Sequence, residues 1–281
     1  MARFNLDYPR LRRLNKALVY ASISSFGQTG PYRDRLGYDL IAFAMSGIMA
    51  TTGEKGRPPI RMSVPVADIA AGHYASTAIL AALARRLVTG RGDYIDLSLH
   101  DSIVSWLTYL ASYYFATGKE PQRLGSAHPS IVPYQAFRCK DKDIVLAIGN
   151  DHQWRNFCRA TGLERLLADT RFSTNPSRVK NRETLIPILQ RMFQRKNAKD
   201  WRKILAQAKV PAAPIFRIGD VARDSHIRYR RMILKSSSDA PYLGSPMKFY
   251  KTKPKRASSP PRLGQHTTEI LAGDNHSHSK A

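Results

Sequence analysis

The first part of the chain alternates short apolar runs with longer segments of helical period. A run rich in β-forming residues at 18–23 predicts a short buried strand, and a second strand is expected at 94–99. Helices are predicted at 8–14, 38–47, 68–87 and, with Asp101 as its cap, 101–115. Because strands that alternate with helices build a layered sheet, this pattern predicts an α/β fold.

The composition changes between Gly118 and Pro133, where glycine, proline, serine and polar residues dominate. We interpret this stretch as the passage into a second domain, in which Trp154 and Trp201 are expected in the core. Strands are predicted there at 135–138 and 144–148, and helices at 151–161, 182–195 and 198–208. The predicted organisation is a large α/β domain at 1–117, a small α+β domain at 118–218, a return to the large domain at 219–272 and a loose tail at 273–281.

The overall composition is that of a folded globular protein. The 281 residues are 43% hydrophobic, which is enough for a sizeable core. No uninterrupted apolar run approaches the roughly 20 residues of a membrane span, and the N-terminus lacks a signal-peptide pattern, so a cytoplasmic location is predicted. Cys139 and Cys158 are expected to be buried structural thiols. No Cys/His spacing matches a zinc site, so no metal is predicted.

The chain carries a formal net charge of +24, which is large for an enzyme of small molecules. Twelve basic residues against three acidic ones lie between Arg217 and Arg262. Such a surplus attracts polyanions, and CoA, nucleic acid or an acidic protein would each satisfy it. A solvated basic face without a specific partner is an equally open interpretation.

The most informative segment is Pro65–His73, which places Asp68 at the head of a helix rich in small residues. A carboxylate facing a helix N-terminus lies among unpaired N–H groups and the positive end of the helix dipole, which favours its ionised form. Asp is also a preferred N-cap residue, so a purely capping role and a nucleophilic role are both open from this segment alone.

The blocks around Asp68 resemble a known family. Ser24–Tyr32, Gly37–Leu40 and Thr89–Ser98 flank Asp68 in a collinear order that is similar to the family III CoA-transferases. Further family-like blocks are Ala147–Asp151, Asp169–Phe172, Asn181–Glu183, Val210–Pro214 and Leu263–Thr267. The resemblance runs from about Arg3 to Leu271, and it implies an incomplete Rossmann-like large domain beside the small α+β domain.

The resemblance implies a chemistry for these residues. Asp68 falls on the family's catalytic aspartate, which forms an aspartyl-CoA thioester while CoA moves from an acyl-CoA to a carboxylic acid. CoA is then a substrate, and no tightly bound cofactor is expected. The positions implied for CoA binding are Arg3, Arg35, Leu36, Gly37, Tyr38 and Asp39.

A loop of the small domain is implied to shield the reacting groups or to donate N–H groups to the oxyanion. The matching residues here are Gly125, Ser126, Ala127 and His128, which depart from the glycine-run version of the family. His128 is open to two interpretations, a contact with the acceptor carboxylate or a structural role in the loop.

Tyr38 separates the family's two chemistries. The racemase branch has a histidine at this place, and a phenol with a pKa near 10 is a poor substitute for imidazole near neutral pH. Transferase is therefore favoured over acyl-CoA racemase. Tyr38 packing on its helix stays an alternative, and Asp151, near the position of the racemase's acidic partner, is expected to cap its helix.

In the family pattern, a first βαβ unit that carries much of the CoA site comes before the block in which Met1 of this chain lies. Because the family's subunits interlock as dimers, a homodimer or a hetero-oligomer with a chain supplying that unit is expected, and membranes and specific nucleic-acid binding are not. The rival hypothesis is a non-catalytic subunit or truncated paralogue that binds a partner or a polyanion. The activity of this chain alone is open.

Overall fold

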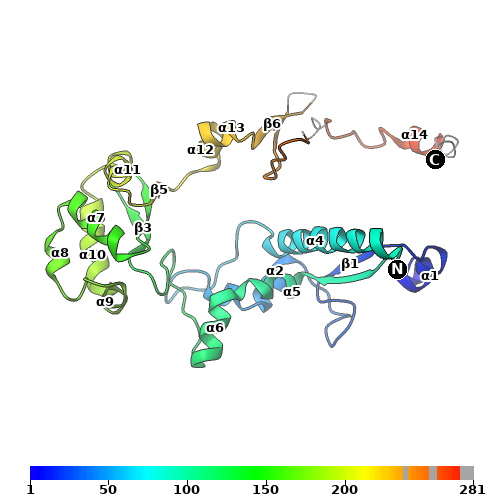
Figure 1. Cartoon of the computed structure of the whole chain (residues 1–281), viewed down its shortest axis with the longest axis horizontal. Coiled ribbons are helices and arrows are strands. Elements are labelled where there is room, and N and C mark those ends of the chain that lie inside the picture. The colour runs from blue at the N-terminus through cyan, green and yellow to red at the C-terminus, as the bar shows by residue number, and fades with distance from the viewer. Residues whose placement is uncertain (237–239, 253–257, 273–281) are drawn as a thin grey trace. The chain divides into compact units, whose positions relative to one another are not determined.

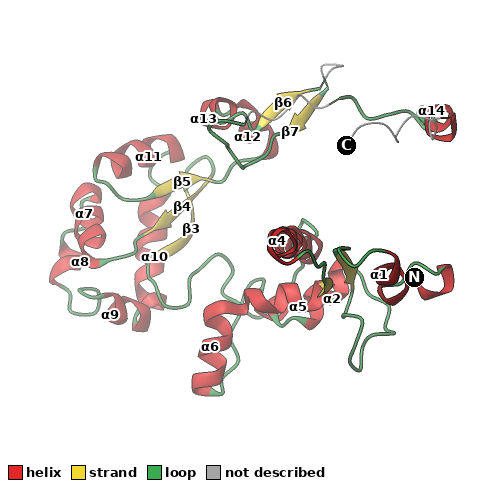
Figure 2. Cartoon of the chain, turned by 45° about the vertical axis from the view of Figure 1, so that its right-hand side comes forward, coloured by secondary structure: helices red, strands yellow, loops and turns green. Residues whose placement is uncertain are grey.

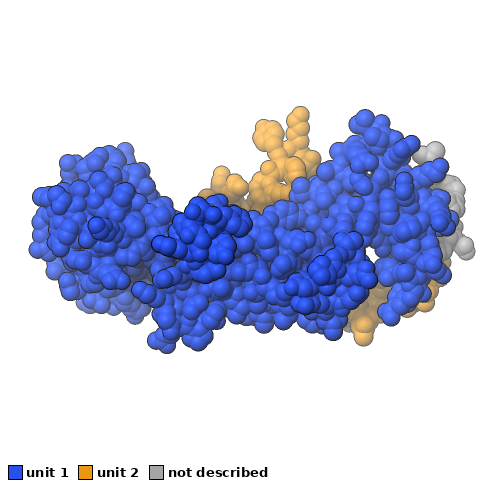
Figure 3. Space-filling model, turned by 90° about the horizontal axis from the view of Figure 1, so that it is seen from below, with its two compact units in different colours: residues 1–213 blue, residues 214–281 orange. Residues whose placement is uncertain are grey.

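The computed structural model describes residues 1–236, 240–252 and 258–272, and it divides into two compact units, 1–213 and 214–281 (Figure 3). The predicted tail, 273–281, lies outside the described residues. Each unit is described by itself.

An α/β layer occupies the first part of the first unit. Strands β1 (Tyr20–Ser24) and β2 (Tyr94–Ser98) pair in parallel, with Tyr20 opposite Tyr94. Helix α4 (Val66–Thr89) runs along them (Figure 1). The other elements are η1 (Ala2–Phe4), α1 (Tyr8–Leu14), α2 (Asp39–Met45), α3 (Ile48–Thr51), α5 (Leu99–Val104), η2 (Ser105–Leu107) and α6 (Thr108–Thr117). A parallel pair joined through a helix confirms the predicted α/β class.

Helix α4 buries a face of small residues. Its alanines at 67, 70, 71 and 75 are at most 5% exposed, which lets neighbouring elements approach closely. Gly90 ends the helix in a left-handed conformation that glycine adopts without strain. Within the described residues α4 alone is long and apolar enough to cross a membrane by length and composition, and a third of that apolar stretch is buried in the fold. Polar residues, Asp68 and His73 among them, interrupt it.

The single helix predicted at 101–115 is wrong, because the chain forms α5, η2 and α6 there. Ser98 caps α5, its Oγ accepting the Asp101 N–H at 2.8 Å, so the predicted Asp101 cap is also wrong. Thr108 has a φ of 44°, and this conformation, strained for a β-branched residue, separates η2 from α6.

The second part of the first unit has its own core. Strands β3 (Tyr134–Arg138) and β4 (Asp143–Ala147) are antiparallel, and β5 (Ala212–Pro214) pairs on the other side of β4. Five helices pack on one side of this sheet (Figure 2): α7 (Asp151–Thr161), α8 (Arg165–Ala168), α9 (Asn175–Lys180), α10 (Arg182–Phe193) and α11 (Ala198–Gln207). Its hydrophobic cluster, drawn from 132–210, is separate from the smaller cluster of the α/β layer, drawn from 42–103.

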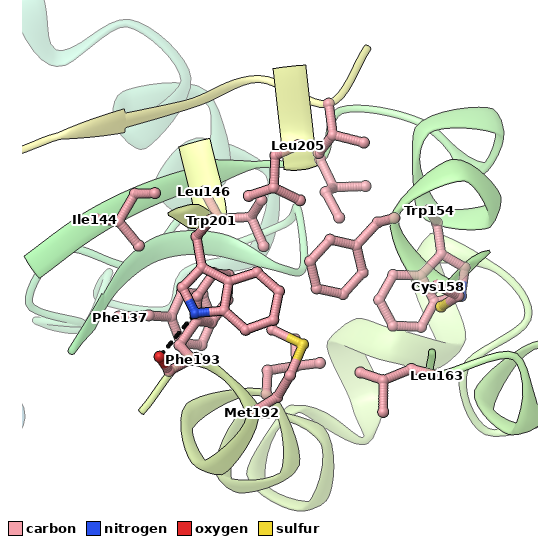
Figure 4. Packing of buried hydrophobic residues seen from close by; sticks show 14 of the residues in the cluster. Phe137, Ile144, Leu146, Trp154, Cys158, Leu163, Met192, Phe193, Trp201 and Leu205 are labelled. Atoms are coloured by element: carbon pink, nitrogen blue, oxygen red, sulfur yellow. Dashed lines mark hydrogen bonds between the residues drawn. The ribbon is translucent and has the colours of Figure 1, made fainter. Parts of the chain in front are cut away.

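The tryptophans lie in this core, as predicted. Trp154 and Trp201 are 1% and 3% exposed. The Trp201 ring packs edge-on against Phe193, and its Nε1–H donates to the Phe193 carbonyl at 2.8 Å (Figure 4). Cys139 and Cys158 are buried, and burial raises the pKa of Cys139 to about 11 and that of Cys158 to about 12. These thiols have the environment of structural residues, as predicted.

Asp151 does not cap α7, contrary to the prediction. Asn150 is the cap, its Oδ1 accepting the Gln153 N–H at 2.9 Å. Asp151 instead pairs at 2.8 Å with Arg178, whose side chain is fully buried. Arg178 also donates to the carbonyl oxygens of Val132 and Phe172 at 2.7 and 3.1 Å. Each of the three nitrogens of this buried guanidinium therefore has an acceptor, which makes Arg178 a structural centre of the small-domain core.

The second unit contains short elements. They are α12 (Ile218–Arg223), α13 (Ser225–Tyr229), the antiparallel pair β6 (Ile233–Lys235) and β7 (Pro241–Leu243), and α14 (Thr267–Ala272). Among its described residues no hydrophobic side chain is buried. The domain boundaries drawn from the sequence at 118, 219 and 273 stay predictions.

Candidate active site

Asp68 lies in the first turn of α4 but does not cap it. The N-cap position is Pro65, which has no side chain able to accept a hydrogen bond. Within the part of the chain that the structure describes, the Asp68 carboxylate has no hydrogen-bond or ion-pair partner, and it is exposed to solvent. The purely capping interpretation of Asp68 is therefore wrong in this structure.

Asp39 performs the capping. It is the first residue of α2, and its Oδ1 accepts the Ala67 N–H at 2.7 Å. Through this short, charge-assisted hydrogen bond, a residue of α2 supplies the acceptor for one of the otherwise unpaired N–H groups in the first turn of α4. It also ties the start of α2 to the start of α4 and leaves the Asp68 carboxylate without a capping task.

The two carboxylates influence each other. Partial burial raises the pKa of Asp68, and the nearby negative charge of Asp39 raises it further. This direction is opposite to the one expected from the helix dipole alone, because burial, and after it the second negative charge that Asp39 brings to the same helix end, disfavour the ionised form of Asp68. A carboxylate with a raised pKa is a stronger base, which favours nucleophilic attack by its ionised form.

The segment before α2 combines a tight backbone with open side chains. An added Cβ on Gly37 would lie 2.8 Å from the Ser25 Cβ, and the Gly37 carbonyl accepts the Ser25 hydroxyl at 2.8 Å. Gly37 is therefore required for close packing. Leu36 and Tyr38 are 95% and 80% exposed. Arg35 stacks over the Tyr32 ring at 3.8 Å to the centroid and is also exposed.

Some of the positions expected to bind CoA have exposed side chains, and others have structural roles. Arg35, Leu36 and Tyr38 have side chains that a ligand can reach. Arg3 is exposed in η1, where its guanidinium lies 4.7 Å from the centre of the Phe4 ring. The oxygen of Asp39 that accepts the Ala67 N–H already has a structural role.

The loop at 125–128 uses its backbone donors within the chain. The N–H groups of Gly125, Ala127 and His128 donate to the carbonyl oxygens of Gly53, Leu124 and Tyr134 at 2.8, 3.0 and 3.0 Å. The Ser126 hydroxyl accepts the Ala136 N–H at 3.0 Å. Three of the four N–H groups expected to face an oxyanion are therefore already engaged, and the loop in this arrangement forms a wall.

His128 is held as a structural residue of this wall. Its ring lies between Tyr109 and Tyr134, with ring centroids 5.7 and 5.5 Å away. Its Nδ1 accepts the Ser130 N–H at 3.1 Å. The carbonyl oxygens of His128 and Pro129 both accept Nη2–H groups of Arg182, at 3.3 and 2.6 Å. Of the two interpretations of His128, this geometry favours the structural one.

Sequence reasoning missed Arg182 and Asp39 in these roles. Arg182 belonged to a family-like block without an assigned function, and no periodicity signals its contact with a loop more than 50 residues away. The capping bond of Asp39 joins residues 28 positions apart. In the described part of the chain no group of three or more metal-binding side chains lies close together.

Comparison with known proteins agrees with the resemblance seen in the sequence. The model of the family described as CoA-transferase family III matches residues 1–267. Succinyl-CoA:glutarate CoA-transferase of Homo sapiens is 36% identical and aligns with 96% of this chain and 63% of its own length. Succinate–glutarate CoA-transferase of Agrobacterium fabrum is 37% identical, with 97% of this chain and 69% of the relative covered.

The fold agrees as well. The crystal structure of a CAIB/BAIF family protein from Brucella suis superimposes with a TM-score of 0.85 at 39% identity, over 96% of this chain and 71% of that one. The chain spans about three fifths of the length of the curated relatives it matches first, which are covered to 61% and 63%.

Proposed function

Because the chain belongs to CoA-transferase family III, we propose that it takes part in CoA transfer from an acyl-CoA to a carboxylic acid, with Asp68 as the nucleophile. The observation that supports this proposal is the free Asp68 carboxylate in the first turn of α4, where Asp39 has taken over the capping hydrogen bond. A residue needed only as a cap would make that bond itself.

The proposed reaction proceeds by two acyl exchanges at Asp68. An oxygen of its carboxylate attacks the thioester carbonyl of the donor. The C–S bond then breaks, which releases CoA as a thiolate and leaves a mixed anhydride between the donor acid and Asp68. The thiolate then attacks the Asp68 carbonyl, which releases the donor acid and leaves an aspartyl-CoA thioester. The acceptor carboxylate repeats these steps in reverse, so the thioester bond is conserved and no external oxidant, metal or base is required.

We assign the binding of CoA to the exposed residues near α2. A guanidinium matches a phosphate in charge and in geometry, so Arg35 and Arg3 are proposed to contact the phosphates. Leu36 and Tyr38 offer apolar surface beside Arg35. The phenol of Tyr38 stands where a racemase would need an acid–base group, so α-proton exchange is the lesser alternative activity.

A partner polypeptide is part of the proposal. Leu80, Leu87 and Val88 on α4 are 67%, 86% and 87% exposed, and in the described residues the parallel sheet has only two strands. Exposed apolar surface and open strand edges favour association. We propose that a second copy of the chain, or a chain that supplies a βαβ unit, completes this layer as an interlocked oligomer in the cytoplasm.

The second candidate function is a non-catalytic subunit. The second unit combines basic side chains with exposed apolar ones and has no buried hydrophobic residue among those described. Such a surface is suited to an acidic partner or to sequence-independent polyanion binding that weakens with salt. A free Asp68 has no role in that alternative.

The test is chemical trapping at Asp68. The chain, alone and co-expressed with a candidate partner, is incubated with succinyl-CoA and glutarate and then treated with hydroxylamine, and peptides are analysed by mass spectrometry. Modification at Asp68, and loss of transfer in Asp68→Asn, are expected. Asp101→Asn is the matched control, because Asp101 is also a first-turn aspartate, 81% exposed, on α5. Full activity of Asp68→Asn would contradict the covalent mechanism.

A further inference from the structure

A cavity of about 740 Å³ lies beside the loop at 125–130 in the first unit. Its wall includes Thr51 at the end of α3, Tyr109 and Leu110 of α6, Val179 of α9 and Arg182, the first residue of α10. A volume of this size is typical of sites for small organic ligands. Of the residues around this cavity, only the loop at 125–128 belongs to the candidate active site.

Arg182 brings a positive charge to this cavity without a carboxylate partner. Among the described residues its hydrogen bonds all come from Nη2, to the carbonyl oxygens of His128 and Pro129. Burial lowers the pKa of Arg182, and no neighbouring carboxylate counters that shift. The remaining N–H groups, on Nη1 and Nε, have no partner in the described structure and are not enclosed. A half-buried guanidinium in this state is a ready partner for an anion.

The other charged groups at the cavity leave a positive balance. Lys55 and Lys119 also line it, and Glu120 is the single carboxylate among the lining residues. Lys55 lies 4.0 Å from Glu183, but their side chains are 72% and 90% exposed, so solvent weakens this pair. Even when Glu183 is counted with Glu120, three positive charges lie beside two negative ones, and Arg182 is the least exposed of the three cations.

Much of the remaining wall is apolar or aromatic, and Thr51, Gln122 and Ser130 are its uncharged polar residues. Leu110, Leu124 and Val179 contribute aliphatic surface, and Tyr109 and Tyr113 contribute rings. A free inorganic anion would leave this surface without a contact, whereas a short hydrocarbon chain ending in a carboxylate would use both the apolar wall and the guanidinium. The cavity is also larger than a small diacid needs, which leaves room for the thioester arm of an acyl-CoA.

From this arrangement we infer that the cavity binds the remote carboxylate of a dicarboxylic substrate, as free diacid or as its CoA half-thioester, through Arg182. Lys55 is the second contact, and the aliphatic chain lies along α6. The inference deepens the proposed transferase function and rests on it for the identity of the reacting end.

Helix α3 takes part in both the cavity and the core of the α/β layer. Met49 of α3 packs against the cluster that contains Ala67, the neighbour of Asp68, and Thr51 at the end of the same helix lines the cavity. The cavity therefore shares one helix with the cluster to which the first turn of α4 belongs.

The experiment measures direct binding of acids to the full 281-residue chain by isothermal titration calorimetry at low ionic strength, without any CoA compound. Glutarate monoamide, whose one carboxylate represents the remote carboxylate of the diacid, is compared with valeramide, a neutral compound of equal chain length, and with inorganic phosphate. The monoamide is expected to bind about tenfold more tightly than valeramide, since a hydrogen-bonded charge pair contributes this much. Equal binding of the two amides would overturn the inference, and so would displacement of the monoamide by phosphate at similar concentrations.

Variants locate the site. Arg182→Gln is expected to weaken binding of the glutarate monoamide about tenfold and to leave valeramide binding unchanged, and Arg182→Lys, which can keep the loop carbonyl contacts, is expected to lose less. Arg191→Gln is the matched control, because Arg191 is an exposed arginine of the same helix that does not line the cavity. Unchanged binding of the monoamide in both Arg182 variants would overturn the assignment.

The two proposals fail separately. Binding of the glutarate monoamide that depends on Arg182 but is unaffected by Asp68→Asn supports the cavity even if no transfer is detected. Transfer that requires Asp68 but shows no preference for diacids over monoacids would leave the transferase proposal standing and would overturn the role of Arg182.

Discussion

Replacing Asp39 tests whether α4 is capped from another element. The Oδ1 of Asp39 accepts the Ala67 N–H at 2.7 Å, and Asp39→Ala removes this acceptor, leaving the N–H of a buried residue unpaired. Loss of a capping carboxylate costs about 1 to 2 kcal/mol. Asp39→Asn keeps an acceptor but not the charge, so roughly half of that loss is expected.

Hydrogen exchange measured by mass spectrometry reports this cost where it arises. A loss of about 1 to 2 kcal/mol corresponds to exchange about 5- to 30-fold faster in peptides covering the first turns of α4. Peptides from the separate core around Trp154 and Phe193 are expected to be unchanged, because they belong to a different cluster. Asp101→Ala serves as control, since the Asp101 side chain is 81% exposed on α5.

Two results would refute this reasoning. Exchange in α4 within twofold of the unmodified chain would mean that the bond from Asp39 contributes nothing to the helix end. A uniform increase across both cores would mean that Asp39 acts on the whole unit and not on α4. The same variants also test the electrostatics, because removing the charge of Asp39 should lower the pKa of Asp68 toward its ordinary value.

Two further predictions concern the core of the small domain. Arg178→Gln removes three hydrogen bonds of a fully buried side chain and should destabilise this core by about 3 kcal/mol, roughly 1 kcal/mol for each bond, in urea unfolding followed by tryptophan fluorescence. Arg171→Gln, in a solvent-exposed pair, should leave the midpoint nearly unchanged. With pKa values of about 11 and 12, Cys139 and Cys158 should react with iodoacetamide at pH 8 more slowly in the folded than in the urea-unfolded chain, by about 100-fold for Cys139 and about 1000-fold for Cys158. Their contribution to stability should fall as the pH rises from about 9 through these raised pKa values. Equal rates in both states would show that the thiols are accessible.

Local pattern was sufficient for most elements. The helices at 8–14 and 151–161 begin and end where they were predicted, because each has a polar cap and a regular apolar stripe. Both predicted strands of the α/β layer form and pair in parallel. The error at 101–115 has a local cause that periodicity does not register, the positive φ of Thr108 inside an otherwise helical run.

The site was predicted less completely, because its decisive contacts are long-range. Asp68 could be singled out by the blocks around it, but its release from capping depends on Asp39, which lies on another helix. Asp151 and Arg178 are similar, since a carboxylate at the start of a helix looks like a cap until its partner from α9 is known. Patterns of charge and period identify candidates, and only the packing of distant segments assigns them their partners.

Two acidic residues lie at the start of α4, and they have different tasks. Asp39 gives its oxygen to the Ala67 N–H and therefore contributes to the stability of α4, while Asp68 makes no such bond and contributes little. Burial and the negative charge of Asp39 raise the pKa of Asp68. The stability that this shift contributes is fully present below the ordinary Asp pKa and is lost as the pH rises through the raised pKa, so near neutral pH the ionised Asp68 carboxylate no longer stabilises the fold in this way. A fold selected only for stability would gain by replacing Asp68 with a neutral residue. The arrangement is therefore better explained by a chemical requirement for the Asp68 carboxylate than by a structural one, and Asp68→Asn should be at least as stable as the unmodified chain near neutral pH while losing transfer.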